Sequence, residues 1–451
     1  MTLFRDVCGS ASHPLQQVVA CLVMLSAGAF FTLYVVSPLG YRVGPALLLI
    51  TSLTVLLFRP GALWTRPDNA SGWLLASLLF YTLCLAAVLF IHQADSSEFD
   101  LPLRYLAAGL VLLLLLQFPV SPRLLYGSAA LGGVVAAGVA LYQVSAVGMD
   151  RAQGFDNPIH FGNGALALAA ISAAALGWAR FERHRAIWMT WLLAGMVGGL
   201  VASLMSWTRS GWVALPFMLI LGLLAWRGRW SGCGRNGGTA LAVVTAAVLL
   251  GALFQVDTVR YRFDQAAQEL VGYFERGQND TSIGLRLDMY RAGLTAFSRE
   301  PLSGAGPDGL GQVIDELVVA GEIHPDVAGY RHLHNQYIDN LARYGLPGLV
   351  SYLLLLGVPL TLFFLKARSG DARVSAAGSA GVLFVSLHVV VNLTQSMLER
   401  NIGVIMFVFG VVFIWSALKY EEARGSEASV SQPGSKADTG SGLQDGQRGV
   451  F

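Results

Sequence analysis

The stretch HLHNQYIDNLARYGLPGLVSYLLLLGVPLTLFFLK, residues 332–366, joins a polar segment directly to a long apolar run. Its apolar part, residues 345–366, contains no charged residue before Lys366. An α-helix needs about 20 consecutive apolar residues to cross a bilayer. Because only a helix or a closed barrel satisfies its own backbone hydrogen bonds in lipid, this run predicts a transmembrane helix.

Similar runs recur along the whole chain. The chain has 451 residues, of which 54% are hydrophobic and 13% charged, and its mean hydropathy is +0.56. Soluble domains carry about 25% charged residues, so the composition excludes a soluble globular protein. We therefore expect an all-α polytopic membrane protein with about twelve transmembrane helices, at residues 16–36, 43–58, 72–92, 102–118, 123–147, 160–180, 187–206, 210–226, 239–256, 345–366, 374–394 and 401–419.

This pattern divides the chain into four segments. Residues 1–256 hold spans 1–9, residues 257–343 form one large, mostly helical polar loop domain, and residues 344–420 hold spans 10–12. Residues 421–451 are rich in Gly, Ser and charge and predict a disordered tail. Ser26-Ala27-Gly28-Ala29 is similar to a signal-peptide cleavage site, but the apolar run continues to Val36. The first span is therefore expected to remain uncleaved.

The basic residues of the short loops predict the orientation of the chain. One set of alternate loops holds twelve Lys and Arg: Arg59, Arg66, Arg123, Arg180, Arg183, Arg185, Arg227, Arg229, Arg235, Lys366, Arg368 and Arg373. The other set holds four: Arg42, Arg151, Arg209 and Arg400. Loops rich in Lys and Arg stay in the cytoplasm, so both termini are expected there. The polar loop domain then faces outward, which in a bacterium is the periplasm.

The four outward arginines oppose the charge bias, so each needs a reason. For Arg42, Arg151 and Arg400 we expect the side chain to reach lipid headgroups. Arg209 lies in Ser206-Trp-Thr-Arg-Ser-Gly-Trp212, a tight break between two apolar spans. A charge confined between two spans must face an anionic partner, which indicates a functional role.

The first informative segment of the polar loop is Thr281–Arg299. It predicts a helix capped by Thr281 or Ser282 and ended by Glu300-Pro301. Arg286 lies at the edge of an apolar stripe expected to pack on the membrane domain, formed by Leu287, Tyr290, Leu294 and Phe297. The glycine-dense Pro301–Gly309 follows, where backbone amides could approach a ligand. No cysteine lies in the loop domain, since the four are Cys8, Cys21, Cys84 and Cys233, and no disulfide is expected there.

The second informative segment starts at the histidines. Asn335–Tyr344 predicts a helix that stops at Gly345, with Pro347 just beyond. His334 then lies at a helix N-terminus, where the positive end of the dipole disfavours a charged imidazole. A neutral imidazole can accept a proton.

Three interpretations of these histidines remain open. The first is a surface histidine that only forms hydrogen bonds. The second is a metal site built from His324, Asp326, His332 and His334, although no cysteine or glutamate-rich partner is near. The third is a general base, which the neighbouring arginines favour because they suit an anionic leaving group.

Several of these motifs, taken in order, resemble the O-antigen ligase and polymerase superfamily. They are Ser206…Arg209-Ser-Gly, Ser282…Arg286…Tyr290, Pro301…Gly304-x-Gly306, and His334-Asn335 followed by Gly345-x-x-Gly348. The stretch from His334 to Gly348 resembles the ligases in particular. The resemblance covers the whole topology, with twelve spans and a large outward loop after the ninth.

The resemblance implies a metal-independent, inverting membrane glycosyltransferase with a GT-C-like fold, no cofactor and a bacterial inner-membrane location. Its partners would be undecaprenyl-diphosphate-linked O-antigen, the lipid A core oligosaccharide and the bilayer, with no nucleic acid. His334 resembles the essential histidine, and Arg209 and Arg286 resemble the essential arginines. Tyr290 and His332 would also line the substrate site, and His332 remains an alternative base.

Two other functions stay open from the sequence. An O-antigen polymerase would use the same donor but a second lipid-linked glycan as acceptor. A transporter is disfavoured because few charged residues lie within the spans, and His388 and Asn392 are its best candidates.

Overall fold

The computed structural model describes residues 14–58, 66–226, 257–330 and 332–430, in which all regular elements are helices. Ten segments within these ranges are long and apolar enough to cross a membrane, and a shorter apolar helix follows Arg209. The predicted all-α polytopic class is therefore confirmed. The ninth predicted span, 239–256, lies outside the described residues.

The helices of the bundle coincide with the other eleven predicted spans to within a few residues, except where two extend further. They are α2 (Pro14–Leu33), α3 (Pro38–Phe58), α5 (Asn69–Ile91), α6 (Asp100–Gln117), α7 (Pro122–Leu141) with a π-helical turn η2 (Tyr142–Ala146), α8 (Pro158–Ala179), α9 (Arg185–Met205), α10 (Arg209–Trp226), α15 (Gln336–Ala367), α16 (Ala372–Val391) and α17 (Asn401–Val430). A short 3₁₀ turn, η1 (Ser96–Phe99), precedes α6.

Helix α17 corrects the expected start of the disordered tail. Residues 421–430 continue this helix, and residues 431–451 lie outside the described part of the chain. The extension is helical because its acidic side chains have partners. Glu421 accepts a hydrogen bond of 2.8 Å from Trp178 Nε1, and Glu422 pairs with Lys419 at 2.7 Å.

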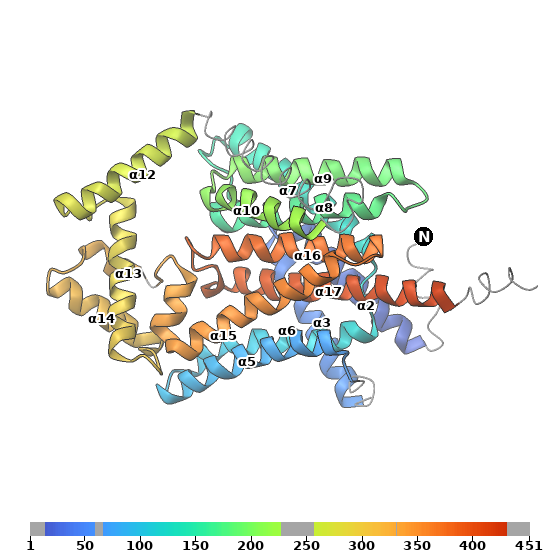
Figure 1. Ribbon diagram of the computed structural model, residues 1–451, viewed down its shortest axis with the longest axis horizontal. Helices are drawn as coiled ribbons and strands as arrows, with labels where there is room; N and C mark the ends of the chain where they lie inside the picture. The colour runs from blue at the N-terminus through green and yellow to red at the C-terminus, as the bar shows by residue number, and fades with distance from the viewer. Residues whose placement is uncertain (1–13, 59–65, 227–256, 331, 431–451) are drawn as a thin grey trace, which may run out of the picture.

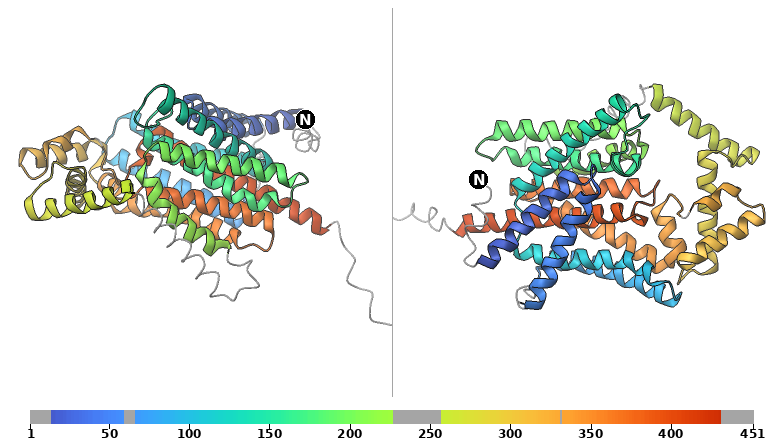
Figure 2. Two further views of the ribbon diagram at one scale, coloured as in Figure 1. Left: turned by 90° about the horizontal axis from the view of Figure 1, so that it is seen from above. Right: turned by 180° about the vertical axis from the view of Figure 1, so that it is seen from behind.

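Three further helices project from one end of the bundle. They are α12 (Asp257–Arg276), α13 (Ser282–Arg299) and α14 (Gly306–Val319), followed by the 3₁₀ turn η4 (Pro325–Gly329). Figures 1 and 2 show all three beyond the same end, which we call the α12–α14 end. Because neighbouring helices of the bundle run in alternating directions, the connections 34–37, 147–157, 206–208 and 392–400 also lie there.

The bundle is held by close packing of small residues. Helices α7 and α9 approach so closely that a Cβ on Gly195 would collide with the Ala130 backbone. Lipid tails are as apolar as the side chains of a membrane helix, so the hydrophobic effect does not drive one helix onto another. Small residues at helix crossings instead allow close van der Waals contact between the helices. Helices α8, α16 and α17 are the most buried of the spans and form its centre.

The projecting helices have a small core of their own, and it uses a different face of α13 from the predicted stripe. The expected N-cap is confirmed, because Thr281 Oγ1 accepts a 3.0 Å hydrogen bond from Gly284 N. However, Leu294 is 51% exposed, so the predicted stripe is wrong. The close approach of α13 to α15 is at Gly293, whose Cβ position lies 2.8 Å from Ile338 and 3.6 Å from Ala342. The buried residues of α13 are Gly284, Asp288, Met289, Ala292, Gly293 and Ala296. Helical spacing alone favoured the larger side chains, whereas close packing selected the smaller ones.

Helix α15 crosses from this small core into the bundle, so the predicted domain boundary at residue 343 falls inside it. The predicted interruption at Gly345 is present, with φ 64° and ψ −164°, but the helix resumes at once. The kink is fixed by the turn after α13: Ala305 N donates to Ala342 O at 2.8 Å, and Leu346 N donates to Pro301 O at 2.8 Å. The glycine-dense turn therefore packs on α15, which corrects the expectation that its amides face a ligand.

Replacing Gly345 by Ala should destabilise the protein. A Cβ there would lie 2.7 Å from the carbonyl oxygens of Pro301 and Leu302, and positive φ costs about 1–3 kcal/mol for a residue with a side chain. Thermal unfolding in detergent measures the effect. Gly357→Ala in the same helix is the control, because nothing lies within 4 Å of its Cβ position. Equal melting temperatures for the two variants would contradict this account of the kink.

Candidate active site at the α12–α14 end

The two histidines that precede α15 are held side by side by the leucine between them. Leu333 is fully buried in the small core, so His332 and His334 are both turned away from it. Their ring centroids lie 4.4 Å apart. His334 has φ 51°, and the next residue, Asn335, caps α15 by accepting hydrogen bonds from Tyr337 N and Ile338 N. The expected place of His334 at a helix N-terminus is confirmed.

A side chain from a distant part of the chain fixes the ring of His334. Gln395, in the connection between α16 and α17, places its Oε1 3.0 Å from His334 Nδ1. A carbonyl oxygen only accepts hydrogen bonds, so Nδ1 must carry the proton. The lone pair of the imidazole is then on Nε2, which leaves that atom able to accept a proton.

A buried hydrogen-bond network holds the 392–400 connection in place. Asp339, which is fully buried in α15, accepts hydrogen bonds from Leu333 N at 3.1 Å and from Ser396 Oγ, and it pairs with Arg343 at 3.1 Å. Gln336 Oε1 accepts from Leu398 N at 2.8 Å. The same network therefore anchors both the histidine segment and the segment that carries Gln395.

The surroundings keep both histidines neutral. Burial lowers the pKa of His334, the hydrogen bond to Gln395 opposes this effect, and the positive charges of Arg286 and Arg400 lower the pKa further. Burial and the neighbouring His334 lower the pKa of His332 to about 4. A depressed pKa means that the neutral form dominates at pH 7, as a proton acceptor requires.

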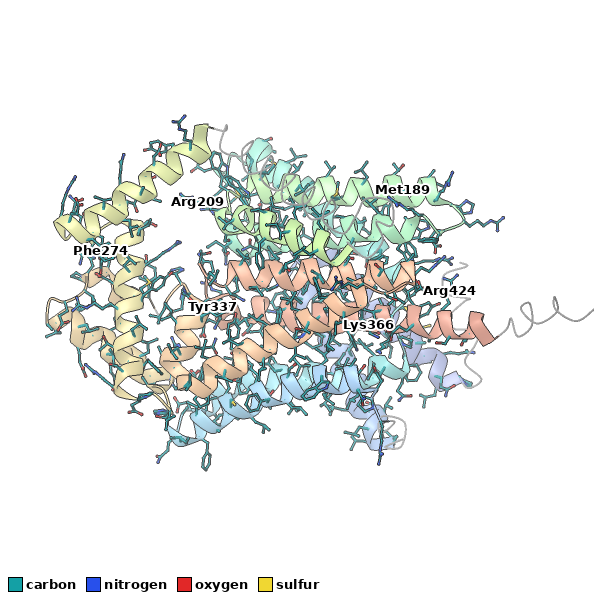
Figure 3. The ribbon with its side chains drawn as sticks, in the orientation of Figure 1. Met189, Arg209, Phe274, Tyr337, Lys366 and Arg424 are labelled. Atoms are coloured by element: carbon teal, nitrogen blue, oxygen red, sulfur yellow. The ribbon has the colours of Figure 1, made fainter. Side chains whose placement is uncertain are left out.

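The structure assembles part of the predicted site. Arg286 is half-buried, about one turn after the start of α13, and its charge acts on His334. Tyr290, one turn later, packs its ring on the small core. Arg209 begins α10, and Figure 3 places it, like Tyr337 of α15, at the α12–α14 end.

The break before Arg209 is a turn held in shape by side-chain hydrogen bonds. Thr208 Oγ1 donates a 2.7 Å hydrogen bond to Pro158 O, and Ser206 Oγ donates to Thr208 Oγ1 at 2.8 Å. Arg151 Nε donates to Ser206 O at 3.1 Å. Arg151 therefore helps to shape this turn, in addition to any contact with headgroups.

The other two outward arginines also have partners within the protein. Arg42 Nε donates to Tyr41 Oη at 2.8 Å. Arg400 pairs with Asp156 at 3.8 Å, and Asp156 lies 2.6 Å from His160 Nδ1. Arg400 thus pairs with an acidic side chain, and its charge also lowers the pKa values of the two site histidines. This role was missed when Arg400 was assigned to headgroups.

The four side chains considered as metal ligands do not form one cluster, although His332 and His334 lie side by side. Among the described residues no group of three or more His, Cys, Asp or Glu side chains is placed to hold a metal ion. His324 instead caps η4, where its Nδ1 accepts a 3.2 Å hydrogen bond from Asp326 N. The transporter candidate His388 is also satisfied, because its Nδ1 lies 2.9 Å from Phe384 O.

Gln395 and Asp339 are the site residues that sequence reasoning did not find. Gln395 lies between two predicted spans and Asp339 lies within a predicted helix. A polar side chain in either position has many possible partners, so the sequence does not indicate which one it contacts. Only a contact between positions 61 apart in the chain, His334 and Gln395, reveals the role of the glutamine. The polar run Thr394-Gln395-Ser396 between the last two spans was the available signal.

The fold and the site together define a polytopic helical membrane protein with a histidine–arginine site at one end of its bundle. Residues 194–353 match the family model described as O-antigen ligase. The matched region spans all five predicted site residues, from Arg209 to His334, so this part of the chain is similar to that family. An uncharacterised protein of Haemophilus influenzae is 23% identical over 388 residues, which cover 85% of this chain and 95% of that protein.

Replacing Asp339 by Ala should strongly destabilise the α12–α14 end. The change removes the ion pair of Asp339 with Arg343, which is 9% exposed, although the charge of Glu399 still acts on Arg343; breaking a buried ion pair costs about 3–5 kcal/mol. Ser396→Ala is the graded control, because it removes one hydrogen bond, worth about 1 kcal/mol. Chemical unfolding in detergent gives both values, and an Asp339→Ala protein as stable as Ser396→Ala would contradict the central role of Asp339.

Proposed function

We propose that this protein is an O-antigen ligase, a glycosyltransferase that moves a polysaccharide from undecaprenyl diphosphate to the lipid A core oligosaccharide. The proposal rests on the match of residues 194–353 to the O-antigen ligase family model and on one observation above all, the 3.0 Å contact that leaves His334 Nε2 able to accept a proton. It places the α12–α14 end in the periplasm of the bacterial inner membrane and both termini in the cytoplasm.

The reaction needs a base and a site for an anionic leaving group. His334 Nε2 takes the proton of the acceptor hydroxyl, whose oxygen attacks the anomeric carbon of the donor. The bond from that carbon to the diphosphate breaks, the anomeric configuration inverts, and undecaprenyl diphosphate departs with the bonding electrons. The donor is already activated by its diphosphate, so no nucleotide is required.

The arginines stabilise the charge that forms on the leaving group. Arg286 and Arg209 would bind the diphosphate, because a guanidinium makes paired hydrogen bonds to phosphate oxygens. Charge on these oxygens grows as the glycosidic bond breaks, so contacts there stabilise the transition state more than the ground state. His332 would contact substrate beside the base, and Tyr290 would border the site.

His334→Ala should lower transfer by about 100- to 10,000-fold, the usual contribution of a general base. The assay combines purified protein, undecaprenyl-diphosphate-linked glycan and lipid A core, and measures glycan joined to the core. His332→Ala is the matched variant and should keep more activity, because its pKa of about 4 makes His332 a weak base. Loss of transfer in His332→Ala, with transfer retained in His334→Ala, would identify His332 as the base.

The acceptor in the same assay separates ligase from polymerase. A ligase joins the glycan to lipid A core, whereas a polymerase extends one undecaprenyl-diphosphate-linked glycan with another. If the glycan on undecaprenyl diphosphate becomes longer and lipid A core stays unmodified, the protein is a polymerase. That result would overturn the ligase proposal but would still support a glycosyltransferase.

Two substitutions of Arg286 should separate the effect of its charge on His334 from the effect of its paired hydrogen bonds to phosphate. Arg286→Lys keeps the positive charge that lowers the pKa of His334 but loses paired phosphate contacts, so the rate falls while the acidic limb of the pH profile stays. Arg286→Gln removes the charge, so the pKa of His334 rises and activity is lost at a higher pH as the solution is acidified. The measurement is kcat/KM against pH for both variants.

Arg291→Lys is the control on the same helix. Its side chain is 50% exposed and pairs with Glu322, so its replacement should leave the profile unchanged. Full activity of Arg286→Lys, or a similar loss in Arg291→Lys, would count against diphosphate binding by Arg286.

A further inference from the structure

The side chain of Gln395 contacts Nδ1 of His334, and the protonation of Nδ1 decides whether Nε2 can accept a proton. Gln395 Oε1 accepts a hydrogen bond of 3.0 Å from Nδ1, on the opposite side of the imidazole from Nε2. Without that acceptor, the ring proton could occupy either nitrogen, and the ring could turn about its last side-chain bond. A base is effective only when its lone pair points at the proton to be removed.

The backbone that carries Gln395 is fixed on both sides of it. Before it, Asn392 O accepts a hydrogen bond of 2.9 Å from Gln336 N. After it, Ser396 Oγ donates to the buried Asp339, and Leu398 N donates to Gln336 Oε1 at 2.8 Å. These three contacts all end on the first turn of α15, two to five residues after His334. The backbone segments that carry His334 and Gln395 are therefore both anchored to the start of α15.

A neutral amide suits the charges already present around His334. Arg286 faces it from α13, Arg400 from the 392–400 connection, Asp339 from α15, and His332 lies beside it. A carboxylate at position 395 would add a negative charge in direct contact with the ring and would favour the imidazolium. Glutamine orients the ring through the same geometry without that charge, so the base stays neutral.

We propose that Gln395 is the positioning residue for His334, fixing the tautomer with a free Nε2 lone pair and holding the ring toward the acceptor hydroxyl. This role rests on the proposed function for its catalytic consequence, but the contact itself has consequences that do not depend on glycosyl transfer. Gln395 does not touch substrate in this role and acts only through His334.

The Gln395→Glu variant tests the contact directly. The new carboxylate should raise the pKa of His334 by about one unit or more, since an opposite charge in contact favours the charged form. The pKa is measured from the pH dependence of His334 carbethoxylation by diethyl pyrocarbonate, followed by peptide mass spectrometry, in full-length protein in detergent. Gln93→Glu is the matched control, the same substitution at an exposed glutamine at the C-terminal end of α5. It should leave the pKa of His334 unchanged.

The Gln395→Met variant tests positioning without adding charge. It keeps the length of the side chain but cannot accept the hydrogen bond well, so kcat should fall about 10- to 100-fold, as for other partners that orient a functional histidine. KM for the lipid-linked donor should stay the same, because the arginines are untouched. Thr394→Ala, at the neighbouring residue, should retain wild-type kcat.

The outcomes distinguish the contact from the function. A raised pKa of His334 in Gln395→Glu, together with an acidic limb of kcat/KM that moves to higher pH, supports the proposal. A raised pKa with an unmoved acidic limb keeps the contact but removes His334 as the base, and Gln395 then positions no catalytic group. An unchanged pKa of His334, in a Gln395→Glu protein that melts like wild type, overturns the proposal, and so does wild-type kcat in Gln395→Met.

Discussion

Asp339 is the side chain on which the α12–α14 end depends. It is fully buried, and its carboxylate accepts hydrogen bonds from Leu333 N and Ser396 Oγ while pairing with Arg343. An isolated charge in such a place would be very unfavourable, so each of these partners must keep its position. Arg343 in turn donates to Pro307 O at 3.0 Å at the start of α14. One carboxylate thus ties the histidine segment, the 392–400 connection and the projecting helices into a single unit.

The bilayer explains why the site has this form. Within the spans, backbone groups pair inside each helix, and polar side chains are few. Polar chemistry is therefore concentrated where helices end, and the connections that meet at the α12–α14 end bring arginines and histidines from separate parts of the chain together. Arg151 at Ser206 and Arg400 at Asp156 show that these cations are placed by contacts within the protein. A site of this kind suits the proposed donor, whose lipid tail would stay in the membrane while its charged headgroup lies outside it.

The sequence predicted much of this protein because the relevant signals are local. Eleven of the twelve expected spans coincide with described helices, and the cap at Thr281, the helix start near Asn335 and the interruption at Gly345 are where expected. Hydropathy, capping and the need for positive φ act over a few residues, so each can be read without knowing the fold. His334 and Arg286 were singled out from equally local features, a position just before a helix and a position at the edge of a helical stripe, and their catalytic roles remain predictions.

Only the tertiary structure decided which faces and partners these elements use. The apolar stripe expected on α13 is partly exposed, because close packing against α15 required Gly293 and its small neighbours. The Pro301–Gly309 turn binds the kink of α15, and Gln395 contacts a histidine 61 positions earlier in the chain. Such contacts depend on distances between helices that no local pattern encodes. The sequence by itself therefore determined the membrane class, the helices and the chemically active residue types, whereas packing determined their neighbours, because burial and hydrogen bonding between distant segments exist only once the chain has folded.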